Sequence, residues 1–184
     1  MKVSVILPNH NEPEIDAVYC GIRRLYPDWQ VIISNDPEGK GKGWAIREGL
    51  KQAVGDYIIF FDGDGDIPIE QLAPFKAYLE GGGLVAVGVK SLWHLPFRRK
   101  IITFLSRLFI KVLFNLPVRD TQTGIKLFRR DLLPDWKTDG YAFDIEILKQ
   151  IPCWMREIPV ECSIGKGKGL RELWRTFREV IKIR

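Results

Sequence analysis

Three aspartates spaced two residues apart carry the strongest chemical signal in this sequence. Asp62, Asp64 and Asp66 follow directly on Tyr57–Phe61, a short run of bulky apolar residues. Such a run predicts a strand buried on both faces, and open α/β sheets hold ligands at the carboxyl ends of their strands. Three negative charges this close repel each other, so a bound cation is needed to offset the repulsion. Because carboxylates without nearby His or Cys prefer hard ions, we expect all three to bind Mg²⁺ or Mn²⁺.

Other sites with alternating aspartates fit less well. A calcium-binding EF-hand needs Gly at loop position six and Glu at position twelve, where this chain has Ile67 and Ala73. A phosphatase of the haloacid dehalogenase type usually has its aspartate pair close to the N-terminus, with Thr or Val where Asp66 stands. A merely solvated acidic turn does not account for the buried strand that leads into it.

Strands and helices alternate around the aspartates. We expect strands at Val3–Leu7, Gln30–Ile33, Tyr57–Phe61 and Leu84–Val89, and helices from Pro13 towards Tyr26, from Trp44 to Val54, and from Pro68 to the Gly81–Gly83 break. This order is typical of an α/β fold with a Rossmann-like, doubly wound, mostly parallel sheet flanked by helices. No change in composition divides the 184 residues, so a single domain over 1–184 is predicted.

Basic charge is concentrated in the second half of the chain. Residues 166–184 contain seven basic and two acidic residues, and residues 91–119 contain six basic residues and no acid. Phe97–Phe114 and the tail from Leu170 both place apolar residues at helical spacing among these cations. Ile125–Phe128 and Met155–Val160 read as strands, and Asp144–Gln150 as a short helix. The charge favours an anionic partner, which is a phosphate-bearing substrate, a membrane surface or a nucleic acid.

The cysteines and the hydropathy pattern indicate a cytoplasmic protein. Cys20, Cys153 and Cys162 are odd in number and form no metal-spaced pair, so reduced thiols are expected. There is no signal-peptide pattern, and no uncharged apolar run reaches the roughly 18 residues that a membrane span needs.

Several motifs, in order along nearly the whole chain, resemble the family-2 glycosyltransferases with the GT-A fold, above all the dolichyl- and polyprenyl-phosphate sugar synthases. The matching stretches are Leu7–Glu12, Asn35-Asp36, Gly41–Gly43, Asp62–Asp64, Asp120–Arg129 and Gly140–Glu146. The chain departs from the family pattern at His10, where the family has Tyr, at Asn35, where it has Asp, and at Gly88–Lys90, where it has Gly-Ser-Arg.

The resemblance implies a nucleotide-sugar-binding half at residues 1–90 and an acceptor-binding half at residues 91–184, with basic amphipathic helices. In the first half it implies that Asp64 and Asp66 hold the metal while Asp62 faces the ribose or the ion. The nucleotide contacts that it implies come from Pro8, Asn11, Glu12, Asp36 and Lys42.

In the second half the resemblance implies binding of the acceptor phosphate or the donor diphosphate. The candidates for these contacts are Lys90, Arg107, Lys126, Arg129 and Lys168. Asp120 is expected to orient a basic residue or the sugar, and we assign catalytic roles to Asp64, Asp120 and Arg129. Lys168 lies in Gly165–Gly169, which repeats Gly39–Gly43 letter for letter without the spacing of a Walker loop.

The implied function is metal-dependent, inverting transfer of a hexose from a nucleotide sugar, of the GDP-mannose or UDP-glucose type, to a polyprenyl or dolichyl phosphate. The protein would then lie at the cytoplasmic face of a membrane, held by Phe97–Phe114 and Leu170–Arg184. A soluble family-2 enzyme that glycosylates a hydroxyl group remains open and would need a general base from Asp120, Asp144 or Glu146.

Two further classes of protein account for fewer of these sequence features. A nucleotidyltransferase should carry a glycine-rich loop after its first strand, where this chain has Pro8–Asn11. A non-enzymatic module that binds nucleic acid or another anion explains the basic tail but not the three aspartates, so no nucleic-acid partner is expected.

Overall fold

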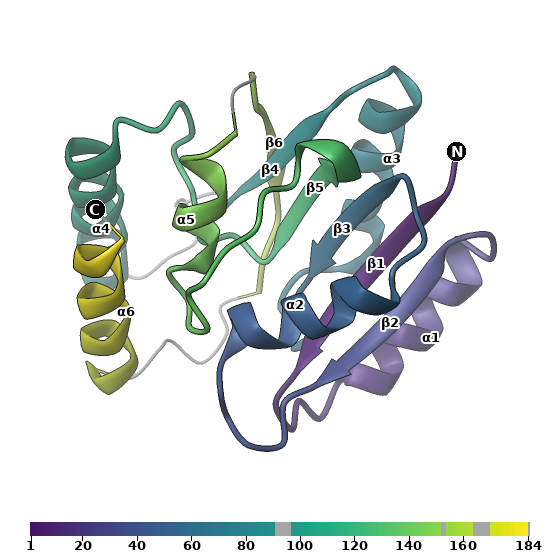
Figure 1. Cartoon of the computed structure of the whole chain (residues 1–184), viewed down its shortest axis with the longest axis horizontal. Helices are drawn as coiled ribbons and strands as arrows, with labels where there is room; N and C mark the ends of the chain where they lie inside the picture. Colours follow the sequence, from purple (N-terminus) through teal and green to yellow (C-terminus); the bar gives the residue numbers. More distant parts are fainter. Residues whose placement is uncertain (91–96, 152–153, 164–169, 184) are drawn as a thin grey trace.

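A mixed sheet with helices on both faces forms the centre of the protein in the computed structural model, which describes residues 1–90, 97–151, 154–163 and 170–183 (Figure 1). The strands of this six-stranded sheet lie in the order β2-β1-β3-β5-β4-β6. Their bounds are β1 (Val3–Asn9), β2 (Gln30–Asn35), β3 (Tyr57–Phe61), β4 (Val85–Lys90), β5 (Ile125–Arg129) and β6 (Arg156–Val160). The helices are α1 (Ile15–Leu25), α2 (Lys42–Gln52), α3 (Leu72–Glu80), α4 (Phe97–Phe114), α5 (Phe143–Leu148) and α6 (Leu170–Lys182), with 3₁₀ turns η1 (Ile69–Gln71) and η2 (Arg130–Leu132).

One antiparallel strand interrupts an otherwise parallel sheet. β1 pairs in parallel with β2 and β3, and β4 with β6, whereas β5 runs antiparallel between β3 and β4. The predicted doubly wound, mostly parallel sheet is therefore confirmed. Because of the reversal, Phe61 lies opposite Ile125 and Tyr57 opposite Arg129. The start of β5 thus joins the carboxyl ends of the other five strands, and this edge is called the carboxyl edge below.

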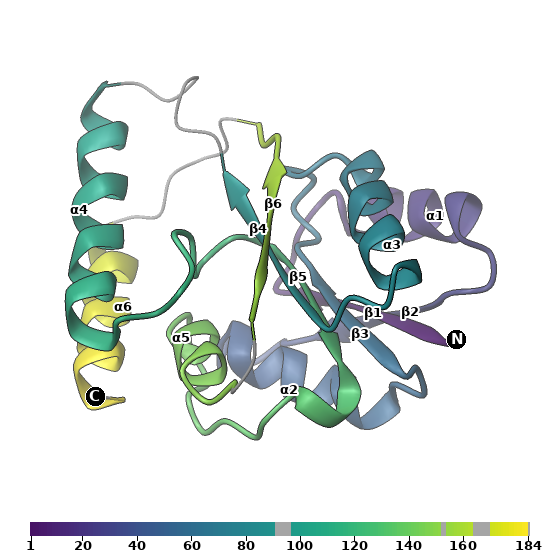
Figure 2. The same cartoon turned by 90° about the horizontal axis from the view of Figure 1, so that it is seen from above.

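Each face of the sheet buries its own apolar cluster. Figure 2 shows α1 and α3 on one face and α2 and α5 on the other. On the α2–α5 face, Phe60 of β3 packs with the rings of Phe128, Trp136 and Phe143, at centroid distances of 5.1, 6.3 and 6.1 Å. A rigid sheet packed on both faces fixes the direction in which each strand delivers its carboxyl-edge residues.

α4 and α6 lie side by side next to α5, on the side of the molecule away from β2 (Figures 1 and 2). Phe109 of α4 stacks on Phe177 of α6 with ring centroids 5.1 Å apart. Ile110 and Val180 are buried and join the core. Among the described helices, none combines the length and apolar character needed to cross a bilayer.

The core also contains a buried ion pair that joins β5 to α5. Lys126 and Asp144 have side chains only 2% and 4% exposed, with 2.9 Å between Nζ and Oδ1. Lys126 Nζ also donates to the carbonyl of Thr123 at 2.6 Å. Burial lowers the pKa of Lys126 and raises the pKa of Asp144, although each partner opposes the shift of the other. Either group alone would be an uncompensated charge in the interior.

We therefore predict that removing one partner is far more harmful than replacing both. Lys126→Met, which strands Asp144, should lower the free energy of unfolding by about 3–5 kcal/mol. The Lys126→Met/Asp144→Leu double variant should be clearly more stable than Lys126→Met alone. The measurement is urea unfolding followed by circular dichroism.

Arg129→Met is the matched control, because it removes the cation of an exposed pair between the last residue of β5 and Asp131 of η2. It should cause little measurable change. Equal losses in Lys126→Met and Arg129→Met, or additive losses in the double variant, would contradict the proposed importance of the buried pair.

Candidate active site

The ion pair between Lys42 and Asp62 lies at the centre of the carboxyl edge. Lys42 is the first residue of α2, Asp62 follows β3, and their Nζ and Oδ1 atoms are 2.5 Å apart. The Asp62 amide donates to the carbonyl of Gly124 at 2.9 Å. A side chain at position 124 would overlap the Asp62 carboxylate, so this position requires glycine. The absence of a side chain at position 124 therefore leaves room for the Asp62 carboxylate beside Lys42.

The pKa shifts of this pair show how strongly the two groups interact. Burial by itself lowers the pKa of Lys42, but the Asp62 carboxylate, followed by Asp144, raises it above the ordinary lysine value. Burial also raises the pKa of Asp62, but Lys42, Lys90 and Lys126 together outweigh this effect, so the pKa is lowered. Both groups are therefore held in their charged forms.

Lys42, Asp62, Lys126 and Asp144 together form a charge cluster, called the quartet below. Each of the two pairs acts electrostatically on the other: Asp144 on Lys42, and Asp62 on Lys126. Two cations and two anions make the quartet neutral in total. The negative charge of Asp62 is thus already balanced by the protein itself.

Beside the quartet lies an acidic group without such balance, formed by Glu12, Asp64 and Asp66. The pKa of Asp64 is raised by burial and then by Asp62 and Asp66, against one backbone hydrogen bond. The pKa of Glu12 is raised by burial and then by Asp64 and Asp62. The Asp66 amide donates to Asp64 Oδ1 at 3.0 Å, and the Ser163 amide donates to the Asp66 carbonyl at 2.7 Å. This point of the carboxyl edge therefore attracts a cation.

The donors here suit a hard divalent ion, although they do not form a finished cage. Within the described ranges no three acidic, His or Cys side chains already converge as ligands of an ion. Asp62 turns to Lys42, which leaves the oxygens of Asp64 and Asp66 for a metal. Mg²⁺ commonly takes one or two carboxylates and completes its shell with substrate phosphates and water. The donor set therefore fits an ion that binds together with a phosphate-bearing molecule.

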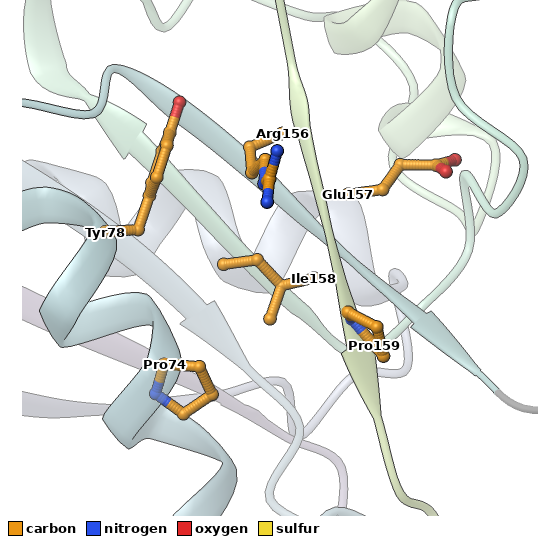
Figure 3. A pocket seen from close by; sticks show the side chains of 6 residues that line it. All are labelled: Pro74, Tyr78, Arg156, Glu157, Ile158 and Pro159. Carbon is orange, nitrogen blue, oxygen red and sulfur yellow. The ribbon is translucent and has the colours of Figure 1, made fainter.

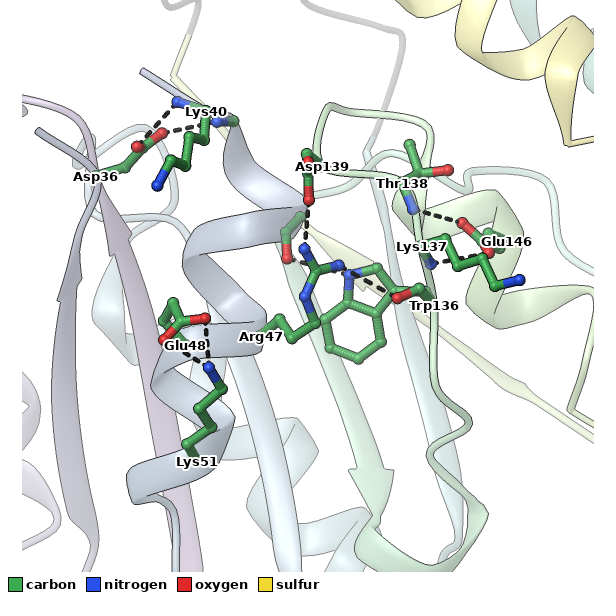
Figure 4. A network of polar contacts seen from close by, with 12 residues as sticks. Asp36, Lys40, Arg47, Glu48, Lys51, Trp136, Lys137, Thr138, Asp139 and Glu146 are labelled. Carbon is green, nitrogen blue, oxygen red and sulfur yellow. Dashed lines mark hydrogen bonds and ion pairs between the residues drawn. The ribbon is translucent and has the colours of Figure 1, made fainter. Parts of the chain in front are cut away.

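Asp36 organises the loop that leads into α2. Its carboxylate accepts hydrogen bonds from the amides of Lys40 (2.9 Å) and Gly41 (2.7 Å), and it is 3% exposed. Its own amide donates to the carbonyl of Asn9 at 2.8 Å. Figure 4 shows this loop beside Asp139, which pairs with Arg47 of α2. In the structure Asp36 shapes the loop for which a nucleotide contact was predicted.

The loop after β1 approaches the same edge. The buried part of β1 ends at Leu7, Pro8 after it is half-buried, and Asn11 has a left-handed φ of 59°. Asn9 Oδ1 accepts from the Glu12 amide at 2.9 Å, which closes a tight turn in this loop. The structure thus brings Glu12 close to the predicted metal ligands, and Pro8 and Asn11 precede it in the same segment.

On the opposite side of Asp62 the edge is more basic. Lys90 ends β4, and Arg107 of α4 donates to its carbonyl at 3.2 Å. Arg107 also pairs with Asp120, with 2.5 Å between Nη2 and Oδ2. Asp120 further accepts from the backbone amides of Lys90 and Gln122, both at 3.3 Å. These contacts attach α4 to the carboxyl edge.

Two predicted residues are not open at this edge, and a third falls outside the described residues. Arg129 is at the opposite end of β5, across from Tyr57, because β5 is antiparallel to β3. Lys126 points into the interior, where it pairs with Asp144. Lys168, with the second Gly-Lys repeat, lies outside the described residues.

Two side chains that matter here were not among the predicted binding residues. Asp144 completes the quartet. The feature of the sequence that could have pointed to it is an acidic residue within the apolar run Ala142–Ile145. Thr123 is fully buried, with no hydrogen-bond partner for Oγ1 among the described residues. The only feature of the sequence that could have pointed to Thr123 is the Thr-Gly pair before β5.

A pocket of about 300 Å³ lies elsewhere, between α3 and β6 (Figure 3). Its lining residues are Pro74, Tyr78, Arg156, Glu157, Ile158 and Pro159. None of these is a predicted site residue, and the pocket offers no group of carboxylates for an ion. The chemistry of the carboxyl edge makes that edge the candidate active site.

Comparison with known proteins identifies the family of this chain. Residues 36–136 match the model of "Glycosyl transferase family 2". Among curated proteins, the dolichyl-phosphate beta-glucosyltransferase of Drosophila melanogaster is 28% identical over 92% of this chain and 58% of its own length. The undecaprenyl-phosphate mannosyltransferase of Micrococcus luteus is 23% identical over 91% of this chain and 87% of its own length. The chain spans about half the length of the dolichyl-phosphate relatives that it matches.

A similar fold is known from a solved structure. Glucosyl-3-phosphoglycerate synthase from Mycobacterium tuberculosis, in complex with Mn²⁺, UDP-glucose and phosphoglyceric acid, superposes with a TM-score of 0.76. The match has 19% identity and covers 99% of this chain and 78% of that one. The predicted GT-A fold is thereby confirmed, and the chain belongs to glycosyl transferase family 2.

Proposed function

We propose that this protein is a divalent-metal-dependent, inverting hexosyltransferase that moves a sugar from a nucleotide-sugar donor to a polyprenyl phosphate. One observation favours a phosphate acceptor over a hydroxyl acceptor, which would need a general base. The three acids that could serve as a general base are all engaged by the protein itself: Asp120 by Arg107, Asp144 by Lys126, and Glu146 by the amides of Lys137 and Thr138.

A phosphate acceptor does not need such a base. The second pKa of a phosphate monoester is near ~6, so one oxygen is already ionised at neutral pH. It can attack the anomeric carbon in a single displacement that inverts the configuration. What this acceptor needs instead is cationic surroundings, because its charge approaches the donor diphosphate. Lys90 lies on that side of Asp62 and would provide this charge, next to Arg107, whose own charge is paired with Asp120.

The acidic group and the loop of Asp36 support binding of the nucleotide-sugar donor, and this part of the carboxyl edge is called the donor side below. Asp64 and Asp66 would hold Mg²⁺ or Mn²⁺, which when bound neutralises charge on the departing diphosphate. The Lys42–Asp62 pair would orient the donor, since both groups are charged and fixed. Glu12, Asn11 and the Asp36 loop border the space where the nucleoside would lie. GDP-mannose and UDP-glucose remain the candidate donors, and the glucosyltransferases among the relatives favour glucose.

A soluble acceptor is the second candidate. The solved relative with UDP-glucose and phosphoglyceric acid has its fold in common with this chain and binds a small phosphorylated acid. The observation against it is a stripe of exposed apolar side chains on α4, which a small acceptor does not require. These residues, called the α4 stripe below, are Ile101, Phe104, Leu105, Leu108 and Val112, with exposures of 43, 59, 56, 46 and 76%.

The α4 stripe supports peripheral attachment to an anionic membrane. Exposed Lys111, Arg178 and Lys182 accompany it on α4 and α6, and residues 97–114 contain no acid. An apolar stripe bordered by cations is the composition of a helix that lies in a membrane interface. Each cation near an anionic leaflet contributes about 1 kcal/mol. A polyprenyl phosphate would also be presented at such a surface.

The first prediction concerns the metal. Asp64→Asn removes a ligand charge without changing the size of the side chain, so affinity for UDP in the presence of Mn²⁺ should fall by about tenfold or more. Isothermal titration calorimetry measures this affinity. Asp28→Asn, at an exposed position before β2, is the matched control and should bind as the unmodified protein does. Unchanged affinity in Asp64→Asn, or in the unmodified protein with EDTA, would refute the metal site.

The second prediction concerns the membrane. At low salt the protein should float with vesicles of phosphatidylcholine and phosphatidylglycerol but not with phosphatidylcholine alone, and salt should release it. Val112→Glu should abolish flotation, because it places a carboxylate in the α4 stripe. Val54→Glu is the matched control, since Val54 is 66% exposed but lies after α2. If Val112→Glu floats normally, or instead converts a dimer to a monomer in size-exclusion chromatography, the stripe does not bind lipid.

A further inference from the structure

α6 contacts both loops that border the donor side of the carboxyl edge. Arg175 donates from Nη2 to the carbonyl of Lys40 at 3.0 Å. Its Nε pairs with Glu179 Oε1 at 3.2 Å. Glu179 Oε2 in turn accepts from the Ala142 amide at 3.2 Å, and its carboxylate occupies the space that a side chain at Gly140 would fill. Two residues one turn apart on α6 thus connect the loop of residues 36–41 with the loop of residues 138–142.

These two loops also touch each other and lead directly into the quartet. The Trp44 amide donates to the carbonyl of Asp139 at 3.1 Å. A side chain at Gly41 would come within 2.5 Å of the same carbonyl, so the loops can approach only because position 41 is glycine. The Lys40 amide is bound by Asp36, and Lys42 follows two residues later. A displacement of Lys40 is therefore transmitted to the charged side chains of the site.

The outer side of the same helix is apolar. Phe177 and Ile181 are 39% and 53% exposed, and Phe177 stacks on Phe109 of α4. α6 therefore has site loops on one side and the surface that continues from the α4 stripe on the other. Any partner that holds α4 and α6 in place acts on an element that directly contacts the donor loops.

We propose that Arg175 and Glu179 are positioning residues through which seating of α4 and α6 on an anionic lipid surface orders the donor loops and tightens nucleotide binding. This inference rests on the proposed membrane attachment. Bound lipid restricts the motion of the helix pair, and the hydrogen bonds to Lys40 and Ala142 extend that restriction to residues 36–44 and 138–142. Nucleotide then binds loops whose ordering has already occurred, which raises its affinity.

Hydrogen–deuterium exchange on the full chain tests the coupling directly. Exchange at residues 36–44 and 138–142 is compared with and without vesicles of phosphatidylcholine and phosphatidylglycerol, in the unmodified protein, Arg175→Ala and Arg178→Ala. Arg178 is the matched control, because it is an exposed arginine of the same helix. Both substitutions remove one positive charge, so both should weaken flotation alike.

Vesicles should slow exchange in both loops in the unmodified protein and in Arg178→Ala, but not in Arg175→Ala. Affinity for UDP with Mn²⁺ should rise about threefold to tenfold on addition of vesicles, again except in Arg175→Ala. Glu179→Ala, which removes the acceptor of the Ala142 amide, should reproduce the loss. A merely structural role would change exchange equally with and without vesicles.

The outcomes separate this inference from the proposed function. If the unmodified protein does not float, membrane attachment itself fails. If it floats but vesicles leave exchange at residues 36–44 unchanged, attachment stands and the coupling is refuted. Equal vesicle-dependent protection in Arg175→Ala and Arg178→Ala would also overturn the role of Arg175, with folding of each variant confirmed by circular dichroism.

Discussion

The charge balance of the quartet is the constraint on which the rest of the carboxyl edge depends. Lys42 comes from α2, Asp62 from the end of β3, Lys126 from β5 and Asp144 from α5. Each of these charges is costly inside the protein and becomes tolerable only beside its partner. The four elements must therefore meet at one place, which also fixes the position of Asp64 and Asp66. Since the quartet neutralises Asp62, the remaining acids are those that a bound cation would have to compensate.

The same principle distinguishes the two sides of the edge. On the donor side, Glu12 and Asp64 have raised pKa values because burial and their neighbours disfavour another negative charge. On the other side, Asp120 is matched by Arg107 and by the amides of Lys90 and Gln122, which donate to its carboxylate. An acidic group without charge balance, beside a side of the edge where the acid is matched by a cation, suits a reaction in which a metal–diphosphate leaves and an anion attacks. This arrangement, more than any single residue, supports a phosphate acceptor over a hydroxyl group.

Much of this could be predicted from the sequence, because the signals are local. The apolar run Tyr57–Phe61, the breaks at Pro27 and Gly81–Gly83, and the alternation of strands and helices identified every strand of the sheet within a few residues. The placement of Asp62 and Asp64 at one edge followed from the rule that ligands bind at the carboxyl ends of parallel strands, and that of Asp36 followed from the family resemblance.

The predictions that were wrong have one physical cause. The direction of a strand and the partners of a side chain depend on residues far away in the sequence. Nothing local indicates that β5 enters the sheet antiparallel, so Arg129 was grouped with residues that lie at the other end of the strand. Lys126 was predicted to bind a phosphate, because its partner Asp144 is distant in sequence and only the tertiary structure joins them. Likewise, the contacts of Arg175 with Lys40 bridge most of the chain.

The most direct test of the account is a transfer assay that compares undecaprenyl phosphate with undecaprenol. The two acceptors share a lipid tail and differ in the phosphate, so the comparison isolates the need for an ionised nucleophile. With UDP-glucose or GDP-mannose and Mn²⁺ in vesicles, we expect sugar transfer to undecaprenyl phosphate alone, abolished by EDTA. Transfer to undecaprenol, or to 3-phosphoglycerate in preference to the lipid, would contradict the account and require a general base or a soluble acceptor site.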